Sequence, residues 1–334
     1  MSIARRKFLK SSLALFSAGS IVEHVAASSP RVMWFSGEPF VSMRDISRFY
    51  GMEYLRPSSE VVELKSRWSN LVFNTKSRRF ELNGVVVWLH EGPRIHRNDW
   101  IITRTDAQRM IDPILRPNAH LRGRTPRVVV IDPGHGGRDK GAVGGRNVQE
   151  KLAVMDISRR MRAHLETMKI RSVLTRDSDV FLSLDRRVQI SNRNRADLFV
   201  SVHLNASTNA SAHGIESFIL TSPGFPSTNS SDRKRVPKIA HPGTPFDNRS
   251  TAAGYALQRH MLDTTGAEDR GLRQARFHVL KEVKAPAVLV EGGFLSNRRE
   301  QDRILHASYR DRLALGVARG ISEYFNHCRR AQLQ

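Results

Sequence analysis

The C-terminal two-thirds of the chain alternates short apolar runs with amphipathic segments. The apolar runs predict strands at 127–131, 171–175, 198–202 and 287–290, of which 127–131 is of the buried type and 198–202 is typical of a strand covered on both faces. The segment 150–168 carries its apolar residues at helical spacing. Alternating strands and helices predict an α/β domain over residues 127–326, with a mostly parallel, twisted sheet flanked by helices. The same pattern predicts helices at 184–194, 252–265 and 300–326, extended segments at 214–220 and 277–280, a loop at 221–250 and a C-terminal tail at 327–334.

Residues 31–115 have a different pattern, in which short β-rich pieces are separated by polar turns. Strands are expected at 31–35, 61–64, 71–74 and 85–89. The pair Asn83-Gly84 between apolar residues is a strong signal for a hairpin turn. The segments 41–49 and 102–110 are similar to each other, and each enters a short helix after an extended stretch. This layout resembles the small β-rich domain named after the N-terminal domain of copper amine oxidases, which implies a non-catalytic unit. A polar linker with two prolines follows at 116–126.

The first 27 residues have the layout of an export signal. Basic residues come first, then an apolar run of about ten residues, then the small residues Ala26-Ala27. The pair Arg5-Arg6 resembles a twin-arginine signal, which implies export of an already folded protein to the periplasm or cell envelope. No integral membrane segment is expected after the signal is removed, because no stretch approaches the roughly 18–20 apolar residues of a membrane helix.

The charge of the chain points to the kind of partner. There are 54 Lys+Arg against 32 Asp+Glu, a formal net charge of +22, so an anionic partner is expected. Nucleic acid, anionic lipid and acidic cell-wall polymer all fit. Nucleic acid is disfavoured, because export separates the protein from it and only 7% of residues are aromatic and able to stack on bases. The single cysteine, Cys328, excludes an internal disulfide and a thiolate zinc cluster.

Polar residues suited to chemistry stand directly after three of the apolar runs. His135 lies in a glycine-rich segment, His203 follows the run at 198–202, and Glu291 follows the run at 287–290. The carboxyl ends of parallel strands meet at one edge of a sheet, where Glu150 can join from the first turn of its helix. Two imidazoles and a carboxylate make a catalytic zinc site, and a second carboxylate can serve as its general base.

Each of these residues also has a plainer interpretation when it is taken alone. The glycine-rich segment could bind phosphate, His203 could be a packed core histidine, and Glu150 could be an ordinary first-turn acid that suits the helix dipole. Glu291 could simply pair with a basic neighbour. The remaining histidines are interpreted as surface or loop residues, among them His90, His96, His120 and His164.

Together the segments resemble the zinc-dependent N-acetylmuramoyl-L-alanine amidases of the type-3 fold, over about residues 127–326. The matching motifs are Ile131-Asp132-Pro133-Gly134-His135-Gly136-Gly137, Glu150-Lys151, Asp197-Leu198-Phe199-Val200-Ser201-Val202-His203-Leu204-Asn205, Gly214-Ile215-Glu216, Arg270-Gly271-Leu272 and Val290-Glu291-Gly292-Gly293-Phe294. The resemblance implies that His135, Glu150 and His203 bind zinc and that Glu291 is the catalytic carboxylate. It implies peptidoglycan as substrate and partner, an activator protein as a further partner, and hydrolysis of the amide bond between N-acetylmuramic acid and L-alanine.

Two other functions stay open at this point. The chain could be another zinc hydrolase that acts on a different amide or peptide, or a non-catalytic, basic protein that binds the cell wall. Digestion products of purified peptidoglycan separate the first from the amidase, and Glu291→Ala separates the second. If the positive charge holds the enzyme on an acidic wall, its binding to the wall should weaken as salt rises.

Overall fold

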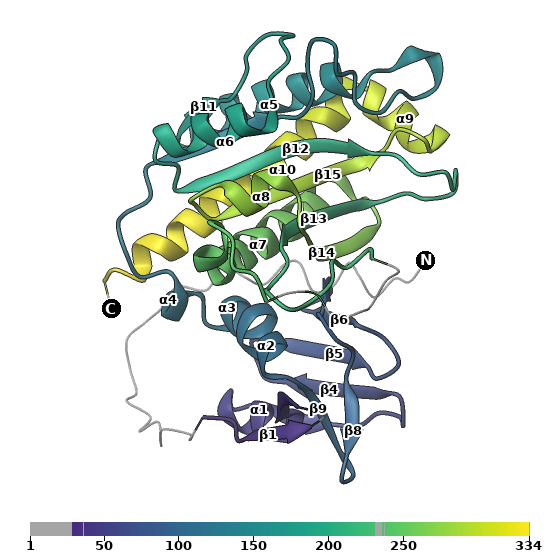
Figure 1. Cartoon of the computed structure of the whole chain (residues 1–334). Coiled ribbons are helices and arrows are strands. Elements are labelled where there is room, and N and C mark those ends of the chain that lie inside the picture. Colours follow the sequence, from purple (N-terminus) through teal and green to yellow (C-terminus); the bar gives the residue numbers. More distant parts are fainter. Residues whose placement is uncertain (1–28, 36, 231–235, 237, 334) are drawn as a thin grey trace.

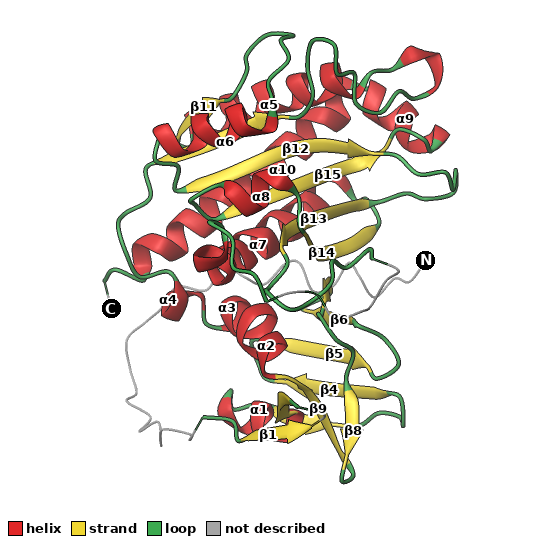
Figure 2. Ribbon diagram, in the orientation of Figure 1, coloured by secondary structure: helices red, strands yellow, loops and turns green. Residues whose placement is uncertain are grey.

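The computed structural model describes residues 29–333, apart from residues 36, 231–235 and 237. The export signal expected at 1–27 lies outside these residues. The described chain forms a layered α/β part whose strands continue into a β-rich N-terminal region (Figure 1, Figure 2). No helix of this described part is both long and apolar enough to cross a bilayer.

The predicted parallel strands are present and adjacent. Four of them form a parallel block in the order β11 (Arg171–Leu174), β10 (Val128–Pro133), β12 (Leu198–Asn205) and β15 (Ala287–Phe294). The next strand, β13 (Ile215–Leu220), is antiparallel to β15, and β14 (Asp269–Ala275) is parallel to β13. The predicted fold class is therefore confirmed, and β13 and β14 run opposite to the other four strands.

Helices cover both faces of this sheet. One face packs its apolar residues in a cluster with α5, α7 and α10, and the opposite face packs against α6 and α8 (Figure 2). The bounds are α5 (Glu150–Thr167), α6 (Leu184–Arg193), α7 (Asp247–Thr265), α8 (His278–Glu282), α9 (Arg298–Leu305) and α10 (Ala307–Arg330). The two faces differ because alternate residues of each strand point to opposite sides.

Several predicted bounds are wrong. The segment 277–280 was expected to be a strand, but α8 occupies it, because a short apolar run such as Val279-Leu280 fits either structure. Helix α7 begins at Asp247 instead of 252, and η4 (Thr244–Phe246) precedes it. Helix α10 continues past the expected end at 326, and Cys328 is buried in the core.

The β-rich N-terminal region is also present. Strands β3 to β7 form a meander, and β7 pairs with β14 at Val87 and Leu272, so the meander extends the large sheet to eleven strands. The Asn83-Gly84 turn joins β6 to β7, with both residues at positive φ, as predicted. The bounds are β3 (Glu53–Leu55), β4 (Val61–Lys65), β5 (Asn70–Asn74), β6 (Arg79–Leu82) and β7 (Val85–Trp88).

The two similar segments of this region lie side by side. Strands β2 (Glu38–Ser42) and β9 (Asp99–Thr103) are antiparallel partners in a second sheet with β1 (Val32–Phe35) and β8 (Arg94–His96). A helix follows each, α1 (Met43–Phe49) and α2 (Arg104–Asp106), and η2 (Ala107–Ile111) and α3 (Asp112–Leu115) continue from α2. Ser42 and Thr103 cap the first two helices in the same way, so the similarity in sequence corresponds to a local repeat.

Two expectations about polar segments are corrected. The linker expected at 116–126 contains a helical turn, α4 (Pro117–His120), because proline is tolerated at the first position of a helix. His90 is not a surface residue: it is 1% exposed, and its Nδ1 lies 2.8 Å from Oδ1 of the buried Asp106. The local sequence could not show this pairing.

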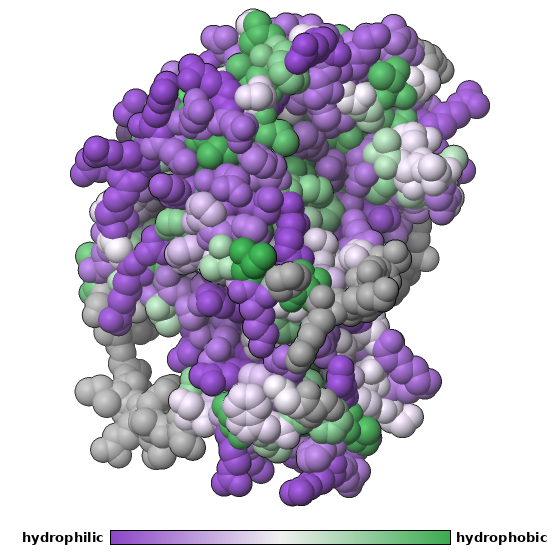
Figure 3. Space-filling model, in the orientation of Figure 1, coloured by the Kyte–Doolittle hydropathy of each residue, from purple (hydrophilic) through white to green (hydrophobic). Residues whose placement is uncertain are grey.

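The face of the molecule drawn in Figure 3 is mostly hydrophilic, with smaller hydrophobic patches.

Candidate metal and catalytic site

The predicted site residues meet at the carboxyl ends of the parallel strands. His203 on β12 is paired in register with Glu291 on β15, and Glu291 is paired in turn with Glu216 on β13. Residues that are directly opposite in a sheet point to the same face, so these three side chains form a row. Gly134 follows β10, the neighbour of β12 on the side opposite β15, and its amide donates a hydrogen bond to the carbonyl of Val202.

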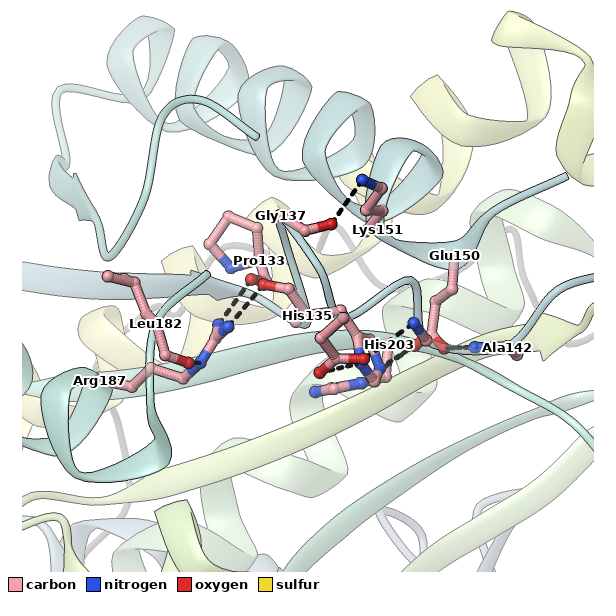
Figure 4. A network of polar contacts seen from close by, with 12 residues as sticks. Pro133, His135, Gly137, Ala142, Glu150, Lys151, Leu182, Arg187 and His203 are labelled. Carbon is pink, nitrogen blue, oxygen red and sulfur yellow. Dashed lines mark hydrogen bonds and ion pairs between the residues drawn. The ribbon is translucent and has the colours of Figure 1, made fainter. Parts of the chain in front are cut away.

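His135, Glu150 and His203 come together as a group that could hold a metal ion. One ligand atom from each lies within 4.8 Å of the others. Oε1 of Glu150 is 3.1 Å from Nε2 of His135 and 3.0 Å from Nδ1 of His203 (Figure 4). Two imidazole nitrogens and one carboxylate oxygen are a donor set found in catalytic zinc sites, so the residues present fit a metal.

Hydrogen bonds fix the orientation of these three side chains. Nδ1 of His135 lies 2.9 Å from a carboxylate oxygen of Asp139, which leaves Nε2 directed toward Glu150. The amide of Ala142 donates to Oε2 of Glu150, and the amide of Leu204 donates to Oε1. Asp139 was part of no predicted site, although its position four residues after His135 is the available signal.

Glycines make room for the group. A Cβ on Gly141 would lie 2.5 Å from Oε2 of Glu150, and a Cβ on Gly134 would lie 2.7 Å from both ring nitrogens of His203. His135 itself has φ 60°, in the left-handed region, and its carbonyl accepts a hydrogen bond from Arg187. The backbone just after β10 is therefore held in this conformation by Arg187, which is not one of the three residues that could bind a metal.

Buried charges hold that strand end in place. Asp132 and Arg187 form an ion pair of 2.7 Å, with side chains that are 1% and 3% exposed. Arg187 also donates to the carbonyl of Pro133, and Arg176 donates to the carbonyls of Pro133 and Gly134. The backbone that presents His135 is thus fastened by two guanidinium groups, since each supplies several donors in one plane.

The electrostatics of the group favour an ionised carboxylate. Burial alone would raise the pKa of Glu150, but hydrogen bonds and charge from His135 and His203 outweigh it and hold that pKa well below its usual range. Burial lowers the pKa of His135, and Glu150 and Asp139 more than compensate, so the net shift is upward. An ionised Glu150 is the form that binds a cation.

Glu291 has the opposite environment. Burial raises the pKa of its carboxyl well above the usual range, and the nearby charges of Glu150 and Glu216 add to the rise. Its Oε2 is buried and has no hydrogen-bond partner among the described residues. A carboxyl whose pKa is raised in this way, beside a group that could hold a metal, is a candidate for proton transfer.

Comparisons with known proteins place the chain in a family. The family described as N-acetylmuramoyl-L-alanine amidase matches residues 129–323. N-acetylmuramoyl-L-alanine amidase AmiA of Escherichia coli (strain K12) is 34% identical over 238 residues, which is 63% of this chain and 80% of that protein. The chain belongs to the N-acetylmuramoyl-L-alanine amidase family, and the enzyme class expected from the sequence is confirmed.

Solved structures support the same assignment. The catalytic domain of the amidase CwlV from Paenibacillus polymyxa has a TM-score of 0.51 and 34% identity, covering 60% of this chain and 98% of that one. The amidase AmiC2 of Nostoc punctiforme has a TM-score of 0.51 and 32% identity, covering 61% and 99%. The reaction of this class is hydrolysis of the amide bond between N-acetylmuramic acid and L-alanine in peptidoglycan.

Proposed function

We propose that the chain is a zinc-dependent amidase of the cell envelope, in which His135, Glu150 and His203 hold the metal and Glu291 moves the proton. The observation that carries this proposal is the convergence of three ligand atoms within 4.8 Å, beside a buried carboxyl with an unpartnered oxygen. The donor set favours zinc, because imidazole and carboxylate ligands with an open position are typical of catalytic zinc sites.

Each residue of the proposed site has its own role in the reaction. When bound, zinc would supply a Lewis acid for the amide carbonyl and lower the pKa of a water molecule. Glu291, next to His203 in the row, accepts the proton of that water at its carboxylate and returns it to the leaving nitrogen of L-alanine. Asp139 keeps the His135 ring in position, and the Asp132–Arg187 pair keeps the strand end in position.

The localisation and partners proposed from the sequence extend this function. A twin-arginine signal at 1–27 would deliver the folded enzyme to the periplasm or envelope, where its substrate is. The net charge of +22 would hold it on an acidic wall. An activator protein is proposed as a partner, and residues 31–115 are proposed to form a small β-rich domain that precedes the catalytic domain at 127–326.

The test uses purified peptidoglycan and mass spectrometry of the products. The full-length enzyme should release stem peptides that begin with L-alanine, and metal analysis should find about one zinc per chain. Glu291→Gln should retain the zinc and the fold but lose at least about 10²-fold in rate. Glu166→Gln, an exposed change on α5, is the matched control and should behave as wild type. Intact lactyl-peptide links, or full activity of Glu291→Gln, would refute the proposal.

A further inference from the structure

Arginine side chains gather on the site face of the sheet, two strands away from Glu291. Glu216 of β13, directly opposite Glu291, is 1% exposed. Its Oε2 lies 2.9 Å from Nε of Arg270 and 3.0 Å from Nε of Arg273, both on β14, and its Oε1 accepts a hydrogen bond from Asn205. Adjacent strands are about 4.8 Å apart, so the backbone of β14, which carries both arginines, lies roughly 10 Å from that of β15, which carries Glu291.

A bulge in β14 directs Arg270 to this face. The pairing of β13 with β14 shifts register between Ile215 and Glu216, so that Arg270 is the extra residue before Gly271, which has φ 93°. The Arg270 guanidinium then stacks over the ring of Phe294, at 4.7 Å from the centroid. Bulges commonly re-aim a side chain beside an active site, and Arg270 and Glu216 belong to motifs that have no role in the metal site.

The N-terminal strands supply the other side of this arginine cluster. Trp88 of β7 donates its indole N–H to the carbonyl of Arg270, at 2.9 Å. The guanidinium carbon of Arg273 lies 4.6 Å from the centroid of the Trp88 ring, and that of Arg79, on β6, lies 5.7 Å from it. Arg79, Arg270, Arg273 and Trp88 are therefore one contact group, built by two regions that are distant in the sequence.

The charge of this group is positive and partly accessible. Three guanidinium groups face two carboxylates, Glu216 and Asp269, which leaves an excess of one positive charge. Asp269 is turned inward, since its oxygens accept from the amides of Val86 and Gly271. The Arg270 side chain is 27% exposed, and Arg79 is exposed. Arg270 already uses Nε on Glu216 and one Nη on the carbonyl of His213. A bound carboxylate would therefore accept from its other Nη and from Arg79, because guanidinium groups form strong, charge-assisted hydrogen bonds with carboxylates.

We propose that Arg270 and Arg79, supported by Arg273 and Trp88, bind a carboxylate of the stem peptide and so select for substrates in which the residue after L-alanine carries a free acid. This inference rests on the proposed function, because it extends from the same reacting bond. It assigns the N-terminal strands β6 and β7 a part in substrate recognition.

The test compares two muropeptides that differ only in whether the carboxylate of the residue after L-alanine is free or amidated. The full-length enzyme should cleave the acid form with kcat/KM roughly tenfold higher, as expected for one charge-assisted contact. Arg270→Gln should remove most of that preference and Arg270→Lys should restore part of it. Arg79→Gln, which leaves Glu216 paired, should reduce the preference about two- to threefold. The amidated muropeptide should respond much less to each change.

The control is Arg162→Gln, which removes one exposed positive charge on α5. It should keep the wild-type preference. Equal cleavage of the two muropeptides by the wild type, or a preference that persists in both Arg270→Gln and Arg79→Gln, overturns the carboxylate subsite and leaves the amidase function standing. Failure of the wild type to cleave either muropeptide overturns the proposed function, and the subsite with it.

Discussion

Gly134→Ala should disable the site through a single added methyl group. The new Cβ would lie 2.7 Å from both ring nitrogens of His203, whereas an ordinary contact begins at 3.4 Å. The strand cannot yield easily, because the amide of Gly134 donates to Val202 and its carbonyl accepts from Arg176. The His203 ring must therefore move by at least about 0.7 Å, the difference between these distances, while metal ligands tolerate about 0.2 Å.

A displacement of this size should cost roughly 10²-fold in kcat/KM and weaken metal retention. The assay combines muropeptide hydrolysis, metal content after dialysis, and thermal unfolding of the same preparations. Gly92→Ala is the matched control, because its Cβ would meet the nearest atom, the carbonyl oxygen of Ser77, at 3.4 Å, far from the site. Wild-type hydrolysis by Gly134→Ala, with the fold intact, would show that the position of His203 does not limit the reaction.

Three further changes test two buried charged groups and the carboxylate that orients His135. Asp247→Asn should stabilise the protein at high pH only: Asp247 is buried with both oxygens unpartnered among the described residues, and burial raises its pKa from 3.8 to about 7, against a smaller lowering by Arg109. The carboxyl of Asp247 ionises at lower pH in the unfolded chain than in the folded one, so the wild type loses stability between about pH 4 and 7. Urea unfolding should therefore show that Asp247→Asn is more stable than the wild type by up to about 4 kcal/mol at pH 8 and equally stable at pH 4. Equal gains at the two pH values would contradict this. Arg187→Met should lower the free energy of unfolding by about 3–5 kcal/mol, because Asp132 stays buried without its partner, and Asp132→Asn in the same chain should recover part of the loss. Asp139→Asn should weaken metal affinity about 10- to 100-fold with an unchanged melting temperature, and an unchanged affinity would mean that Asp139 does not orient His135.

The sequence alone determined the α/β part and the residues at its edge. Doubly buried strands produce uninterrupted apolar runs, so β10, β12 and β15 were visible, and the residues that follow them were placed at one edge by the geometry of parallel strands. His135, Glu150 and His203 do lie together, because all three depend on this local pattern. The short segment at 277–280 was mispredicted because its apolar run is too short to distinguish the two periods.

Only the tertiary structure decided what surrounds that edge. The order β15-β13-β14-β7-β6 sets Glu216 beside Glu291 and brings Arg79 and Arg273 to the same Trp88 ring, yet no local pattern specifies which strands pair. The burial of His90 against Asp106 likewise follows from packing between segments sixteen residues apart. Strand order and buried ion pairs depend on contacts between residues that are distant in the sequence. For this reason the sequence could not show that the N-terminal strands contact the arginine cluster.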